Sequence, residues 1–157
     1  MHQQTVATVF DLDDNEHTRA FKELIVATQQ TGMDSGLGIR YDLVTPDSVQ
    51  LSIDLGPQHH QPAGIVHGGV YTAIVEAAGS SSGSAWLAHH QTGQTIVGVT
   101  NTTDFLRPMR HGRAIAVSTP VHRGRTQQLW LVEIRDADSG KLVARGHLRG
   151  QNVRIQQ

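Results

Sequence analysis

The chain has 157 residues, of which 38% are hydrophobic and 17% charged, a composition typical of one globular domain rather than a disordered segment. It contains no cysteine, so disulfide bonds and cysteine nucleophiles are excluded. Because it lacks both an apolar run of about 18 residues and the basic start of a signal peptide, we expect a cytoplasmic protein that does not enter a membrane. The net charge of −1 conceals a basic C-terminal part, since residues 105–157 contain ten Lys/Arg and three Asp/Glu. We expect these basic residues either to bind a phosphate-bearing ligand or to be neutralised by acidic residues of the other half that lie between them in the fold.

The predicted elements begin with a short amphipathic helix over about residues 15–31. Asp13 or Asp14 is placed to cap its start, and Gly32 is placed to end it. Small and apolar side chains recur along it at helical spacing, which predicts one buried face made by Ala20, Phe21, Leu24, Ile25 and Thr28.

Strands and one long helix follow. Residues 38–45 and 48–55 are predicted strands, and the second alternates apolar and polar side chains. Residues 65–90 contain no proline and much alanine. A helix of about 24 residues there would be roughly 36 Å long, so a small sheet could cover it only by wrapping around it. Four more strands are predicted after short turns, over residues 95–105, 113–122, 127–136 and 142–151. The order predicts a single α+β domain over residues 1–157, with an antiparallel sheet.

The start of the long helix has features of a catalytic site. Gly68 and Gly69 stand where backbone N–H groups have no partner within a helix, and where the helix dipole favours negative charge. A substrate carbonyl at these amides would be polarised as in an oxyanion hole. The same glycines are also expected if the helix start simply packs closely against another segment.

Glu76 is the candidate catalytic carboxylate. Its neighbours along the helix are apolar or small, and a spacing of four residues places it on one stripe with Thr72 and Ser80. A carboxylate in such surroundings is expected to be buried, which favours a role as general base. The alternative is that this stripe faces solvent.

The spacing between these two features predicts a homodimer. Gly68 and Glu76 are separated along the helix axis by about 12 Å, too far for both to contact one substrate carbonyl. Two antiparallel copies of the helix would bring the amide of one subunit to the carboxylate of the other. We therefore expect a dimer with shared active sites, and further association into a dimer of dimers, a homotetramer.

The pattern Gln-Pro-x-Gly-x-x-His-Gly-Gly over residues 61–69, with Glu76 seven residues later, resembles the hotdog-fold thioesterases of the PaaI type. It is most similar to their hydroxybenzoyl- and dihydroxynaphthoyl-CoA thioesterase branch. The resemblance continues through residues 97–108 and 122–130, and covers about residues 35–151. It implies a hotdog fold, a long helix wrapped by a curved antiparallel sheet, and an acyl-CoA thioesterase that releases a free acid and CoA.

The resemblance also implies roles for individual residues. Glu76 would be the base or nucleophile, the Gly68 amide would polarise the thioester carbonyl, and Ser80 would assist Glu76. Gln61 would place the carbonyl or a water, and His67 would shape the helix start. Some relatives carry a histidine near position 105 that recognises a hydroxylated aryl group; its absence here puts an aryl substrate in doubt. The implied substrate-binding residues are Gly69, Phe105, Arg123 and Arg125, the two arginines in a turn suited to CoA phosphates.

No cofactor is expected, because coenzyme A is part of the substrate. The sequence also permits functions other than thioester hydrolysis. A dehydratase or hydratase of the same fold would pair His59 or His60 with Glu76 for proton transfer. A non-catalytic acyl-CoA-binding module would keep the fold without the chemistry. A metal site is not expected, since the histidines lack a convincing i, i+4 set, and neither is nucleic-acid binding, since only 4% of residues are aromatic. The side chains expected to line the acyl pocket are Trp86, Leu87, Phe105 and Met109.

Overall fold

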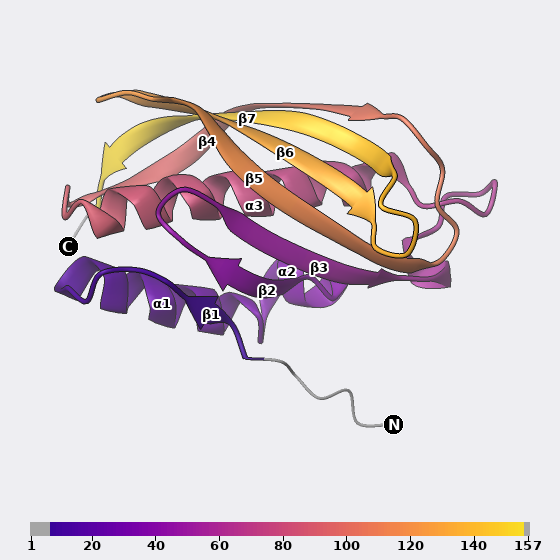
Figure 1. The fold of residues 1–157 in the computed structure, drawn as a ribbon, viewed down its shortest axis with the longest axis horizontal. Coiled ribbons are helices and arrows are strands. Elements are labelled where there is room, and N and C mark those ends of the chain that lie inside the picture. Colours follow the sequence, from indigo (N-terminus) through magenta and orange to yellow (C-terminus); the bar gives the residue numbers. More distant parts are fainter. Residues whose placement is uncertain (1–6, 156–157) are drawn as a thin grey trace.

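The computed structural model describes residues 7–155, in which a curved seven-stranded sheet encloses one long helix (Figure 1). The helices are α1 (Glu16–Thr28), α2 (Gly32–Leu37) and α3 (Gly68–His89), and a 3-10 turn, η1, spans Pro57–His59. The strands are β1 (Val9–Phe10), β2 (Arg40–Val44), β3 (Val49–Leu55), β4 (Gln94–Phe105), β5 (Gly112–Arg123), β6 (Gln127–Asp136) and β7 (Leu142–Arg154).

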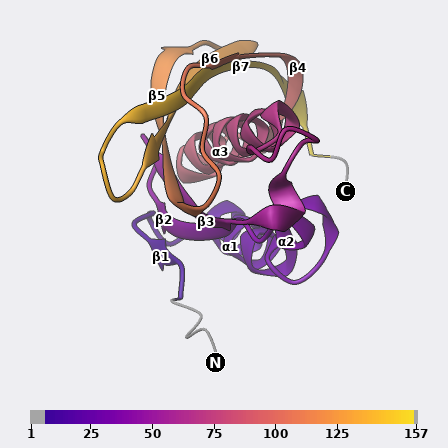
Figure 2. The ribbon, with the colours of Figure 1, turned by 90° about the vertical axis from the view of Figure 1, so that its right-hand side faces the viewer.

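The strands lie in the order β1-β2-β3-β5-β6-β7-β4, and every neighbouring pair is antiparallel except β1 and β2. In Figure 2 the sheet curves around α3, and α1 and α2 lie together near β2 and β3. This is the α+β arrangement, a long central helix wrapped by a mostly antiparallel sheet, that the sequence predicts. Within the described part of the chain, no helix combines the length and apolarity needed to cross a membrane.

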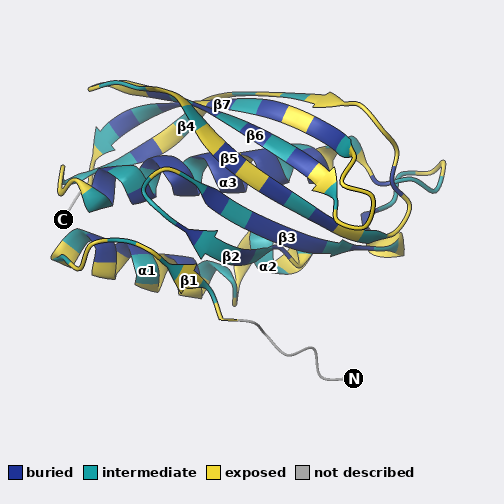
Figure 3. Cartoon of the chain, viewed as in Figure 1, coloured by how far each residue is buried: buried dark blue, intermediate teal, exposed yellow. Residues whose placement is uncertain are grey.

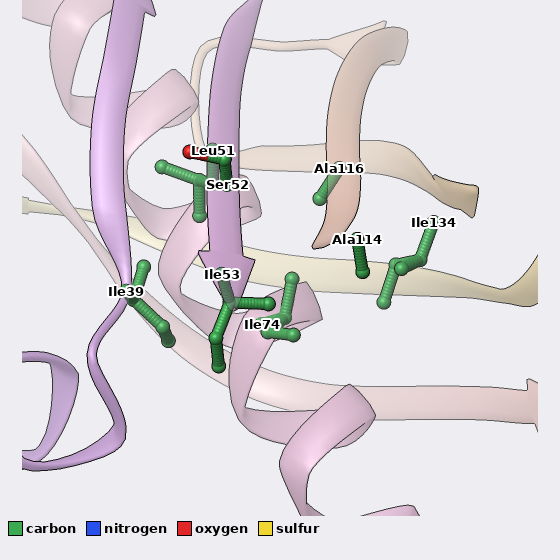
Figure 4. Close-up of a pocket in the computed structure, with 8 residues that line it drawn as sticks. All are labelled: Ile39, Leu51, Ser52, Ile53, Ile74, Ala114, Ala116 and Ile134. Carbon is green, nitrogen blue, oxygen red and sulfur yellow. The ribbon is translucent and has the colours of Figure 1, made fainter. Parts of the chain in front are cut away.

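The core lies between α3 and the concave face of the sheet. Figure 3 shows buried residues along α3 and β3. Trp130 and Ile134 of β6 and Leu148 of β7 are each 0% exposed. Figure 4 shows where Ile74 of α3 meets Ile53 of β3 and its neighbours, and this packing leaves no space for a water molecule. Such closed packing holds α3 at a fixed position under the sheet.

Two glycines of α3 let the sheet approach the helix closely. A Cβ atom on Gly79 would lie 2.6 Å from the side chain of Leu148, and one on Gly83 would lie 2.7 Å from Ile96. Glycine costs helix stability relative to alanine, by about 1 kcal/mol in a helix interior. The close approach of the two layers explains its presence here.

The N-terminal helix is shorter than predicted and has a different N-cap residue. The structure divides residues 16–37 into α1 and α2, and Gly32 begins α2 instead of ending one helix, because its φ of +88° turns the chain there. The cap is Asn15, not Asp13 or Asp14: its side-chain oxygen accepts a hydrogen bond from the Thr18 amide at 3.0 Å.

The prediction for the buried face of α1 was partly wrong. Phe21 and Ile25 are buried together with Thr18, whereas Ala20 and Leu24 are exposed. The contact of α1 with α3 is therefore a narrow stripe rather than a broad face.

Other boundaries also differ from the prediction: β2 is shorter than the predicted 38–45, and β7 continues to Arg154 beyond the predicted end at 151. The long helix begins at Gly68 rather than Ile65, because the preceding segment is extended: the Val66 amide donates to the Met109 carbonyl at 2.8 Å. Strand β1 was not predicted, since two residues are too few to produce a period.

Two neighbouring residues of α1 test this packing. Ile25 is 3% exposed and Leu24 is 60% exposed. We expect Ile25→Ala to lower the free energy of unfolding by about 2–5 kcal/mol, and Leu24→Ala by about 0.5 kcal/mol or less. Urea denaturation of both variants measures the difference, and equal losses would contradict the orientation of α1.

Candidate active site

The N-terminus of α3 presents a backbone amide that can bind a substrate. His67 is the N-cap residue, and its Nδ1 atom accepts a hydrogen bond from the Gly69 amide at 2.8 Å. The Val70 amide donates to the His67 carbonyl at 3.0 Å. Among residues 7–155, the Gly68 amide donates to no backbone or side-chain acceptor outside α3, and as the first helical residue it has no acceptor within α3. Gly68, rather than Gly69, is thus the amide that can receive a carbonyl oxygen.

Phe105 lies directly against Gly68. A Cβ atom built on Gly68 would lie 2.6 Å from the Phe105 ring, so glycine is what allows this contact. The ring is 57% exposed and also lies 6.2 Å from the Tyr71 ring, measured between centroids. The structure therefore brings together Gly68 and Phe105, two residues that the sequence analysis selected separately.

The Glu76 carboxylate lies two turns along α3 and is held by two neutral donors. The Ser80 hydroxyl donates to Oε1 at 3.2 Å, and the Asn101 side-chain amide donates to Oε2 at 3.3 Å. Gly98 of β4 lies against the same group, since a Cβ atom there would be 2.5 Å from Oε1. Ser80 thus contacts Glu76 as expected, and β4 supplies the opposite wall.

The expected burial of Glu76 is not found within one chain. Its side chain is exposed, because the stripe that carries Thr72, Glu76 and Ser80 borders an open cavity instead of the sheet core. Any shielding of this carboxylate from water must come from outside the described chain.

The cavity has a volume of about 590 Å³ and lies between α3 and residues of α2, β2 and β4. Its α3 wall consists largely of small side chains, which leave room for a ligand. At the other side, Tyr41 donates a hydrogen bond to Asp34 at 2.8 Å and accepts one from Ser81 at 3.2 Å. Burial, and then the nearby Asp34 carboxylate, raise the pKa of Tyr41 well above its usual value, so its hydroxyl keeps its proton. The wall includes Met33, Gly69, Ala73, Ala77 and Asn101.

Gln61 and the predicted dehydratase histidines have other partners. The Gln61 side chain accepts a hydrogen bond from the Ala63 amide at 2.7 Å, so it bends back on its own loop. His59 contacts the Leu37 carbonyl at 2.8 Å, and His60 contacts the Arg110 carbonyl. Neither histidine lines the Glu76 cavity, so the pairing that a dehydratase requires is not formed within one chain.

The two arginines lie near the other end of α3. Arg123 forms an ion pair with Asp47, and its guanidinium lies 5.4 Å from the Trp86 ring and 5.8 Å from the Trp130 ring. Trp86 is 18 residues from Gly68, about 27 Å along the helix. One chain therefore does not bring Arg123 to the Gly68 amide. Arg125, two residues later, is exposed to solvent.

Of the four side chains expected to line the acyl pocket, only Phe105 lies beside a candidate catalytic group. Leu87 packs with Trp130 and Trp86 in a separate cluster, and Met109 belongs to the main core. Periodicity could not distinguish these buried apolar residues from pocket residues. Within residues 7–155, no three His, Asp or Glu side chains gather in a way that could hold a metal ion.

Asn101 and Gly98 were not identified as site residues from the sequence. Strict alternation along β4 would put them on opposite faces, but the register with β7 shifts between Gly98 and Thr100. This bulge places both residues toward Glu76, and nothing in the sequence marks it.

Comparison with known proteins identifies a family and several relatives. A family described as the thioesterase superfamily matches residues 63–143. A Mycobacterium tuberculosis protein whose name assigns it provisionally to the esterases is 45% identical over 120 residues, which cover 76% of this chain and 85% of that protein.

Solved structures show the same similarity. The structure of the Mycobacterium tuberculosis protein has a TM-score of 0.74 at 43% identity, covering 79% of this chain and 98% of that chain. AziG of S. sahachiroi has a TM-score of 0.74 at 40% identity, covering 80% and 98%. A thioesterase of Haemophilus influenzae has a TM-score of 0.77 at 30% identity, covering 86% and 92%.

Proposed function

The chain belongs to the thioesterase superfamily, whose members have this hotdog-type fold, and on that premise we propose that it hydrolyses acyl-CoA thioesters in an active site shared by two subunits. The observation that carries this proposal is that one helix holds two groups suited to the reaction. These are the Gly68 amide, which is free to donate a hydrogen bond, and the exposed Glu76 carboxylate, which is held by two hydrogen bonds. An amide that receives an oxyanion and a carboxylate near the carbonyl carbon are what acyl transfer requires.

The geometry of α3 and β4 supports a dimer. The Gly68 amide and Glu76 lie about 12 Å apart along the axis, so in this proposal the amide that serves Glu76 comes from a second, antiparallel chain. Strand β4 ends the sheet, and no strand of residues 7–155 lies on its outer side. Its exposed Val97 and Val99 offer apolar surface to an equivalent strand. A second chain on this side would also shield Glu76 from water.

Apart from water, the proposed reaction needs only groups that two copies of the chain provide. The Gly68 amide stabilises the oxyanion that forms as the carbonyl carbon is attacked. Glu76 either attacks that carbon, forming an anhydride that water then cleaves, or removes a proton from an attacking water. In both routes the C–S bond breaks, and the thiolate of coenzyme A leaves and takes up a proton. Coenzyme A enters as part of the substrate, and no cofactor takes part.

Recognition of CoA rests on charge. Its phosphates suit the basic C-terminal part of the chain, where the side chain of Arg125 is exposed at the β5–β6 turn. Arg123 is already paired with Asp47, so we assign the larger share of phosphate binding to Arg125.

Glu76→Gln tests the proposed chemistry. With a panel of short, long and aryl acyl-CoAs, we expect the wild type to release free thiol from at least one member, and the variant to be slower by about 10²-fold or more. Glu23→Gln, which alters an exposed carboxylate of α1, is the matched control and should keep full activity. Absence of turnover on the whole panel, or turnover by Glu76→Gln equal to that of the wild type, would refute the proposal.

A second pair of variants tests the Gly68 amide alone. Proline is well accommodated at the first position of a helix, and the preceding His67 has φ −65° and ψ 134°, a conformation that a following proline permits. Gly68→Pro therefore removes the N–H, whereas Gly68→Ala adds a Cβ and keeps it. Both must displace the exposed Phe105 ring, so that effect is common to the pair.

We expect Gly68→Pro to lower kcat relative to Gly68→Ala by about 10²-fold, as for loss of one oxyanion-hole donor. Steady-state kinetics on the best acyl-CoA of the panel gives this ratio. If the two variants are equally active, the carbonyl oxygen is bound elsewhere.

A further inference from the structure

Asn101 joins the edge strand β4 to the turn of α3 that carries Glu76. Its side-chain amide donates one hydrogen bond to the Thr72 carbonyl at 3.0 Å and one to Glu76 Oε2 at 3.3 Å. Thr72 and Glu76 are one helical turn apart, so a single NH₂ group spans that turn. Its side-chain oxygen accepts a hydrogen bond from the Thr103 hydroxyl at 2.9 Å.

These contacts determine which way the Asn101 amide faces. The Thr72 carbonyl can only accept a hydrogen bond, so the nitrogen must face the helix and the oxygen must face Thr103. The reversed amide would place its oxygen against a carbonyl and a carboxylate, both of which are acceptors. The direction of the donor aimed at Glu76 is therefore fixed by two acceptors, the Thr72 carbonyl and the Glu76 carboxylate, and the Thr103 hydroxyl donates to the oxygen on the other side.

The Glu76 carboxylate thus receives one neutral donor on each oxygen, Ser80 on Oε1 and Asn101 on Oε2. It takes part in none of the ion pairs found within the described part of the chain. Neutral donors fix the plane of the carboxylate, and they leave its negative charge available for attack or proton removal. A lysine or arginine in their place would bind that charge in an ion pair.

We propose that Asn101 is a positioning residue, which holds the Glu76 carboxylate in its reactive orientation through the Asn101–Thr72–Glu76 contacts. This inference rests on the proposed thioesterase function and goes beyond it, because it gives a residue of the edge strand β4 a role in catalysis. Asn101 acts through Glu76 and not on the substrate carbonyl.

Kinetics of Asn101→Ala provide the first test. We expect kcat to fall by about tenfold, with KM for the acyl-CoA changed by less than about twofold, because the lost hydrogen bond supports the carboxylate and not ground-state binding. In the Glu76→Gln background the same substitution should cause little further loss, since the group that it positions is already gone. Thr102→Ala, on the neighbouring exposed residue of β4, should leave kcat unchanged. An unchanged kcat in Asn101→Ala, or a loss that multiplies fully with that of Glu76→Gln, would overturn the proposal.

The NMR signal of the Glu76 carboxyl provides a readout that does not depend on turnover. In full-length protein with ¹³C-labelled glutamate, this signal is identified by its absence in Glu76→Gln. Removing one of its two hydrogen-bond donors should change the chemical shift of the signal in Asn101→Ala, whereas Thr102→Ala should leave it unchanged.

The two measurements separate the possible failures. If the wild type hydrolyses no thioester, the proposed function fails, but a changed Glu76 signal in Asn101→Ala still supports the contact between Asn101 and Glu76. If Glu76→Gln abolishes turnover while Asn101→Ala keeps the wild-type kcat and the wild-type Glu76 signal, the proposed function stands and the role of Asn101 is refuted.

Discussion

The fixed rise of the α-helix is the constraint on which the rest of the account depends. It places the Gly68 amide and the Glu76 carboxylate about 12 Å apart on one rigid element, and no side-chain rotation can close that gap. In the proposed shared site, a single chain holds two half-sites, one with Gly68 and Phe105 and one with Glu76 and Asn101. The exposure of Glu76 and the open outer edge of β4 agree with this proposal.

The remaining structure keeps those two half-sites in place. The small residues of α3 let the sheet close on one side of the helix and leave a cavity on the other. The bulge in β4 then turns Gly98 and Asn101 toward that cavity, so the strand provides both the room for the carboxylate and one of its donors. A strand with regular alternation could provide only one of these.

Much of the fold could be predicted because its signals are local. The alternating strand near Val49 and the alanine-rich segment around Glu76 predict their own structures, and the distance between Gly68 and Glu76 requires only the helix rise. The failures involve contacts between distant segments. Leu24 and Ile25 have similar hydrophobicity, and only the position of α1 against α3 decides which is buried.

The candidate site residues that the sequence suggests are those that chemistry alone identifies. A carboxylate on a small-residue helix and glycines at a helix start are visible in the sequence. Asn101 was not identified, because its position depends on a register shift. The predicted burial of Glu76 was wrong for one chain, because its side chain borders an open cavity. Sequence reasoning also could not show that the Gly69 amide is occupied by His67.

The most direct test of the shared site is complementation between two inactive variants. Gly68→Pro and Glu76→Gln chains, co-expressed with different affinity tags and purified as the hybrid dimer, contain one site with both an intact Gly68 amide and an intact Glu76. We expect this hybrid to recover about half of the wild-type kcat per dimer, since one of its two sites is complete. A hybrid no more active than either parent variant would contradict it, and would show that the amide and the carboxylate do not act together across two chains.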